Sequence, residues 1–140
     1  VVMAQVKLEL RYQVARQGAV VVTVVEGRNL LNQELVGKQD PYCKLQFGSV
    51  VRRGRTVRKG GRNPYFEEEE FEFWMDDKNW TQTLTLACLD EDVGQDDLIG
   101  QTRFSFLPLC HAGERGATSE EWITIYNGRR VAGELRVKMR

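Results

Sequence analysis

Apolar and polar residues alternate with a period of two along much of this chain. In residues 5–14, for example, every even position is apolar or aromatic and every odd position is polar or charged. Such alternation is typical of a strand with one buried face. No stretch keeps the spacing of a helix for three turns. The pattern predicts an all-β chain, with strands at 5–14, 19–26, 41–47, 51–59, 67–75, 82–90, 101–107, 121–126 and 132–140.

Turn-forming residues separate these predicted strands. Asp40-Pro41 and Asn63-Pro64 mark turns, because proline holds the preceding residue extended and cannot donate to a ladder. Short strands separated by turn residues predict an antiparallel Greek-key β-sandwich, with its loops gathered at two ends. We expect eight strands within residues 18–140 to form the domain. Residues 1–17 would then be an N-terminal extension or an extra edge strand.

Composition fits one ordinary globular domain. The chain has 140 residues, of which 41% are hydrophobic and 29% charged. Its best apolar run, residues 19–25, is too short to span a membrane, and no signal peptide is expected. The three cysteines, Cys43, Cys88 and Cys110, stand in apolar contexts, which predicts free buried thiols in a reducing compartment. We expect a cytoplasmic location, in a piece of a longer protein.

Charges are sorted along the chain although their sum is zero. Basic residues concentrate in 52–62. Residues 63–102, in contrast, carry many acids and a single basic residue, Lys78. Within 88–100, the segment CLDEDVGQDDLIG holds four aspartates and a glutamate. Two carboxylates about 4 Å apart repel by roughly 4 kcal/mol at an effective dielectric near 20, so a cation is the expected partner. Nucleic acid is not expected as a partner, because no recognition helix or aromatic platform accompanies the basic residues.

Catalytic chemistry has little support in the sequence. His111 is the single histidine, and no acid or nucleophile is spaced to pair with it. We therefore expect a non-catalytic domain, which can be part of a larger enzyme or trafficking protein.

Three motifs follow one another in a set order. They are DPYCKL at 40–45, an NP turn before the acidic-aromatic strand EEEEFEF, and DED followed by DDLIG at 90–100. Together they resemble a C2 domain, and the resemblance extends from Gly18 to Arg140. It implies an eight-stranded antiparallel sandwich whose loops at one end bind calcium and touch anionic membranes. Of the two strand permutations of this family, a complete set of eight starting at 19–26 favours the one called type II.

The resemblance also implies a calcium site formed by two loops. Calcium takes roughly 6–8 oxygen ligands, which flexible acidic loops supply. The ligands carried over from the family are Glu34 and Asp40 in the first loop and Asp90, Asp92 and Asp97 in the third. Glutamate at 34, where the family usually has aspartate, and a third loop one residue shorter favour a single ion. A solvated acidic loop without metal is the alternative, which we rank lower because the acids fill every ligand position of the motif.

Apolar residues beside these acids are candidates for membrane contact. Leu35 and Val36 in the first loop and Val93 in the third are expected at exposed positions, where bound calcium would reverse the repulsion from anionic lipid. For Leu35 and Val36, folding back onto the sandwich is an equal alternative. The favoured function is a calcium-regulated module that targets anionic phospholipid membranes as a peripheral protein.

The basic segment supports a second hypothesis. Alternation would place Arg53, Arg55 and Lys59 on one face of a strand over 51–59, with Lys44 on the adjacent strand. Arginine binds phosphate bidentately, so these residues are candidates for a phosphoinositide or an acidic protein partner. The alternatives are a calcium-independent interaction domain that uses this strand, or a charged sheet face that only keeps the protein soluble.

Overall fold

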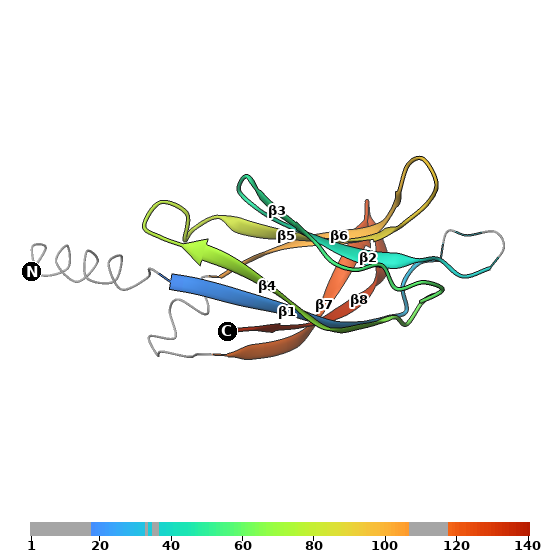
Figure 1. The fold of residues 1–140 in the computed structure, drawn as a ribbon, viewed down its shortest axis with the longest axis horizontal. Coiled ribbons are helices and arrows are strands. Elements are labelled where there is room, and N and C mark those ends of the chain that lie inside the picture. Colours follow the sequence, from blue (N-terminus) through green and yellow to red (C-terminus); the bar gives the residue numbers. More distant parts are fainter. Residues whose placement is uncertain (1–17, 33, 35–36, 107–117) are drawn as a thin grey trace, which may run out of the picture.

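A computed structural model of the chain describes residues 18–32, 34, 37–106 and 118–140, which form antiparallel strands joined by loops (Figure 1). The all-β prediction is confirmed. The predicted strand 5–14 and Leu35, Val36, Cys110 and His111 lie outside the described residues. In the part of the chain described, no helix is long and apolar enough to cross a membrane. The strands are β1 Gly18–Arg28, β2 Pro41–Phe47, β3 Val50–Arg53, β4 Tyr65–Met75, β5 Thr83–Asp90, β6 Asp97–Ser105, β7 Ser119–Asn127 and β8 Arg130–Met139.

The strands follow the order β3-β2-β5-β6-β7-β8-β1-β4. β6 is joined to β7 through the pair Gln101 and Tyr126, so the ladder divides there into two four-stranded layers. Figure 1 shows β3, β2, β5 and β6 in one layer and β4, β1, β7 and β8 in the other. Because β8 pairs with β1, the set of eight is complete from Gly18 onward, as the type II arrangement requires.

The core lies between the two layers. Inward positions alternate along the strands, and Phe47 packs against Phe106 and Phe73 with ring centroids 5.3 and 6.0 Å away. Burying a side chain of this kind stabilises the fold by about 1.5–3 kcal/mol. Cys43 and Cys88 are buried opposite each other on β2 and β5, and both are free thiols, as predicted.

The third strand is shorter than the alternation predicts. β3 ends at Arg53 instead of residue 59. Beyond it, the Gly54 N–H donates to the Cys43 carbonyl and the Val57 N–H to the Pro41 carbonyl, both at 2.8 Å. These bonds hold residues 54–60 as a loop beside β2, so the prediction of a regular strand face through Lys59 is wrong.

The acidic run in β4 contains a bulge. The pairing with β1 steps from Val24 and Glu69 to Glu26 and Tyr65, which leaves extra residues on β4. Glu67 and Glu68 accommodate them with positive φ angles of 60° and 53°. A positive φ costs energy for residues that have a side chain. The pairing of β4 with β1 on either side of the bulge keeps Glu67 and Glu68 in this conformation.

Strand directions bring four connections to one end of the sandwich. β1 runs toward this end, and the antiparallel partners β4 and β8 begin there. The connections that meet are the described parts of the first loop, residues 29–40, the second loop, residues 54–64, the third loop, residues 91–96, and the β7–β8 turn. We call this the loop end.

Candidate metal site at the loop end

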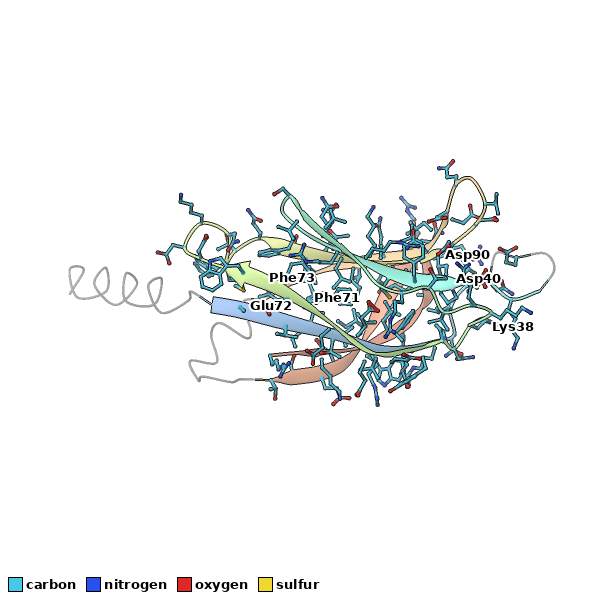
Figure 2. All side chains as sticks on the ribbon, viewed as in Figure 1. Lys38, Asp40, Phe71, Glu72, Phe73 and Asp90 are labelled. Atoms are coloured by element: carbon cyan, nitrogen blue, oxygen red, sulfur yellow. The ribbon has the colours of Figure 1, made fainter. Side chains whose placement is uncertain are left out.

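Backbone hydrogen bonds join the first and third loops at their bases. Pro41 at the start of β2 pairs with Asp90 at the end of β5. The Glu91 N–H donates to the Asp40 carbonyl at 3.0 Å, and the Asp40 N–H donates to Asp90 Oδ1 at 2.8 Å. Figure 2 shows Asp40 and Asp90 together at this end, with Lys38 beside them. The two loops predicted to share a site therefore do converge.

Asp90 is the buried member of the acidic group. Asp90 is only 1% exposed, and its Oδ2 has no hydrogen-bond partner among the described residues. An unsatisfied buried acceptor costs about 1–3 kcal/mol. This oxygen is therefore placed to gain from a cation.

Glu34 brings a carboxyl of the first loop to the acids of the third. Its hydrogen-bonding contact with Asp90, together with the charges of Asp90, Asp92 and Asp97, raises the pKa of Glu34 to about 7. The pKa rises because Asp90 favours the protonated form of Glu34 through this contact, and because the neighbouring negative charges oppose its ionisation. We call the four acids that take part in this interaction the acidic cluster: Glu34, Asp90, Asp92 and Asp97.

Asp40 lies at the edge of this cluster. Its Oδ1 accepts a hydrogen bond from the Lys59 N–H at 2.7 Å, and its Oδ2 lies 3.8 Å from the Arg58 guanidinium. Its carboxylate thus already contacts the second loop, while its backbone N–H donates a hydrogen bond to Asp90. Sequence spacing alone does not indicate this division of roles.

The donor chemistry of the cluster suits calcium. Within the described residues, no three histidine, cysteine or acidic side chains lie together in an arrangement that could hold a metal ion as it stands. All four side chains are nevertheless oxygen donors, they share excess negative charge, and Asp90 Oδ2 is buried without a partner. Calcium accepts such ligands in flexible geometry, so the residues fit the ion.

Tyr42 and Asp96 fasten the third loop. The Tyr42 hydroxyl donates to Asp96 Oδ2 at 2.5 Å, and the Asp92 N–H donates to Asp96 Oδ1 at 3.0 Å. These bonds, the one from Tyr42 foremost, lower the pKa of Asp96. Asp96 therefore shapes the loop around Asp92. Sequence reasoning missed this role, although the tyrosine belongs to the DPY motif.

The tip of the third loop is apolar and open. Val93 is 100% exposed, as predicted, and its N–H donates to Asp92 Oδ1 at 2.7 Å. Gly94 follows with a positive φ of 96°, a turn conformation that glycine adopts without strain. Ile99 is fully buried on β6 behind the loop, so the tip projects from a fixed base.

Glu91 binds the basic residues of the second loop. Its carboxylate accepts hydrogen bonds from Thr56 Oγ1 and, at 2.9 Å each, from the guanidinium groups of Arg53 and Arg58. These bonds lower the pKa of Glu91 to about 2, and the bond from Thr56 contributes most to this shift. The Arg53 guanidinium also lies 3.9 Å from the centre of the Tyr42 ring. No pattern in the sequence indicates that an acid of the third loop would neutralise these arginines.

The predicted anion-binding residues are divided between different environments. The Arg55 guanidinium is 3.3 Å from Glu67 and 3.6 Å from Glu69, both on β4. Lys44 on β2 and Lys59 in the second loop are exposed, and no ion pair to either is found among the described residues. Arg53, Arg55 and Lys59 therefore do not form one free cationic face.

Comparison with known proteins places these features in a family. The C2 domain profile matches residues 18–125. A calcium-dependent lipid-binding protein of Arabidopsis thaliana is 39% identical over 104 residues, covering 74% of this chain and 19% of that protein. The chain spans less than half the length of the first curated relatives it matches.

Solved structures agree with the fold. A C2 domain of a plant extended synaptotagmin 1 superposes with a TM-score of 0.73 at 24% identity, covering 87% of this chain and 92% of that one. The calcium-bound pair of C2 domains of extended synaptotagmin 2 gives a TM-score of 0.74 at 23% identity, covering 88% and 45%. At these identities the likeness establishes the fold. The general class of function that the relatives support is a lipid-binding, membrane-targeting module.

Proposed function

Because the chain belongs to the C2 domain family, we propose that it is a calcium-regulated module that attaches to anionic phospholipid membranes through its first and third loops. The proposal includes a cytoplasmic, peripheral location, supported by the free buried thiols of Cys43 and Cys88. Any catalytic activity would belong to other parts of a longer protein.

The observation that carries the proposal is the acidic cluster. Four carboxyl groups from two loops are close enough to raise the pKa of Glu34 to about 7, and Asp90 keeps a buried oxygen without a partner. A bound cation would stabilise these acids by offsetting the repulsion between them. Glu34, Asp90, Asp92 and Asp97 would hold the ion, with Asp40 at its edge.

The chain's own groups then perform the attachment. When bound, calcium supplies positive charge that cancels the repulsion between the acidic cluster and anionic headgroups. Asp96 and Tyr42 keep the third loop in shape, so that Val93 faces the bilayer. Complete burial of an apolar side chain of this size contributes about 1.5–3 kcal/mol, and partial insertion contributes less. Leu35 and Val36 are proposed to act in the same way from the first loop.

Sedimentation with vesicles tests this proposal. Asp92→Asn and Asp97→Asn together remove two exposed carboxylates of the cluster, while the amide oxygen at 92 can still accept from the Val93 N–H. We expect the double variant to lose calcium-dependent sedimentation with phosphatidylserine vesicles. Asp90 is left intact because its Oδ1 joins the two loops.

Asp77→Asn with Glu121→Gln is the matched control. Both residues are exposed, and both lie outside the loop end, in the β4–β5 connection and on β7. This control should sediment with calcium as the wild type does. Equal calcium-dependent sedimentation by wild type and the Asp92/Asp97 variant would refute the proposal.

The calcium-independent alternative assigns binding to the basic segment. Lys44 and Lys59 favour it because they are exposed, whereas the acids around Arg53 and Arg55 weigh against it. Changing Arg53, Arg55 and Lys59 to glutamate would abolish phosphoinositide binding on this alternative, with no heat in a calcium titration.

A further inference from the structure

The turn between β7 and β8 is part of the loop end. Figure 1 shows it in the half of the molecule that carries the first and third loops. The Asn127 side-chain amide donates to the Leu98 carbonyl at 3.0 Å, just after the third loop. On its other side, the Leu31 N–H of the first loop donates to the Ala132 carbonyl at 2.9 Å. The turn is therefore fixed between the bases of both loops of the candidate site.

The side chains of this turn are cationic, apolar and open to solvent. Tyr126 and Val131 are direct cross-strand partners, with 44% and 64% of their surface exposed. Arg129 and Arg130 stand between them at the tip, both exposed. We call residues 126–131 the hairpin tip.

The arginines of the hairpin tip differ from most others at the loop end. Arg28, Arg53 and Arg58 each bind a carboxylate at about 3 Å. Across the described chain, none of the ion pairs or hydrogen bonds found uses the side chain of Arg129 or Arg130. No carboxylate of the described residues therefore neutralises these two charges.

We propose that the hairpin tip is a calcium-independent contact for the headgroups of anionic phospholipids. The choice of a phospholipid surface rests on the function proposed above. Arginine forms paired hydrogen bonds with phosphate, and tyrosine suits the interface between water and lipid, where its amphipathic ring lies at the level of the headgroups. Val131 adds an apolar side chain beside it.

Its position gives this contact a defined role. The metal-free acidic cluster repels an anionic surface, while the hairpin tip, fixed to the bases of the same two loops, attracts it. Weak attachment through the arginines keeps the loop end near the membrane before calcium arrives. When calcium binds, the first and third loops would contact the membrane in addition to the hairpin tip, which is already attached.

Vesicle binding in the presence of a calcium chelator tests the proposal. Wild-type protein should bind vesicles of phosphatidylcholine with about 30% phosphatidylserine at low salt, and should bind pure phosphatidylcholine much less. Each basic residue near an anionic surface contributes about fivefold to binding, so Arg129→Ala with Arg130→Ala should weaken it about 25-fold. Reversal of both to glutamate should remove it.

Lys78→Ala is the matched control, because Lys78 is exposed in the β4–β5 connection outside the loop end. Its binding should equal that of the wild type, and circular dichroism should show all variants folded. The proposal is overturned if the wild type does not bind these vesicles in the chelator. It is also overturned if the arginine variants bind them as strongly as the wild type does. The Asp92/Asp97 variant separates the two functions. It should lose the calcium-dependent increment, and in chelator it should bind at least as well as the wild type because two repelling carboxylates are gone.

Discussion

At the scale of single residues, acids with similar sequence surroundings have different roles. Asp90 and Asp96 both accept backbone hydrogen bonds, yet Asp90 keeps one buried oxygen unpaired whereas Asp96 is held by Tyr42. The motif predicted the positions of the candidate ligands. It did not predict that Lys59 and Arg58 engage Asp40, because these contacts depend on how the second loop folds.

Glu34→Gln should change how stability depends on pH. The pKa of Glu34 is raised from 4.5 to about 7 in the fold, so the folded state binds more protons than the unfolded state between these values. Wild-type stability without calcium should therefore fall as pH rises through this interval, and this fall should be smaller in the variant. Thermal melting in a chelator, at several pH values across the interval, measures it.

Glu121→Gln is the control for this experiment, since Glu121 is exposed on β7 outside the loop end. Its pH profile should match the wild type. Identical profiles for wild type and Glu34→Gln would show that the acids of the two loops do not interact.

Tyr42→Phe should weaken the third loop while leaving the fold intact. The change removes the hydroxyl that donates to Asp96 and keeps the ring under Arg53. We expect a lower melting temperature and a several-fold weaker calcium affinity in calorimetry, because Asp92 loses part of its support. Tyr65→Phe, at an exposed tyrosine, should change neither quantity. An unaltered calcium affinity in Tyr42→Phe would contradict the role assigned to Asp96.

At the scale of elements, strand existence was easier to predict than strand ends. β2 has the predicted bounds, because Asp40-Pro41 starts it and Gly48 ends it. β3 is too long in the prediction, since the sequence pattern continues past Gly54 while the regular pairing with β2 ends at Arg53. β6 begins earlier than predicted, at Asp97, because Leu98 and Ile99 belong to the strand.

Gly100→Ala tests how closely β6 passes the second layer. A Cβ at this position would lie 2.6 Å from the Ala132 Cβ and 3.2 Å from Ile125, so the layers would have to separate. We expect a loss of about 1–3 kcal/mol in the free energy of unfolding, measured by urea denaturation. Gln101→Ala, on the exposed neighbour, should cost far less. Equal losses would contradict the close approach.

At the scale of the whole molecule, folding mixes charges that are separated in sequence. Lys138, Arg140 and Arg136 on β8 and just beyond it pair with Glu68, Glu70 and Glu120 on other strands of the same layer. Glu91 neutralises the basic residues of the second loop in the same way. Among the described residues, no such ion pair is found for the acidic cluster or for the arginines of the hairpin tip, which both lie at the loop end. A linear reading of charge could not show this, because the pairs join residues far apart in the chain.

A calorimetric titration of the isolated chain with calcium near neutral pH shows whether the acidic cluster binds the ion. We expect saturable binding of one ion, accompanied by proton release because Glu34 is partly protonated near pH 7, so that the heat changes with the ionisation enthalpy of the buffer. The Asp92/Asp97 variant should bind at least tenfold more weakly. A wild-type titration without saturable heat in any buffer would contradict the claim that carboxylates of two loops form a calcium site.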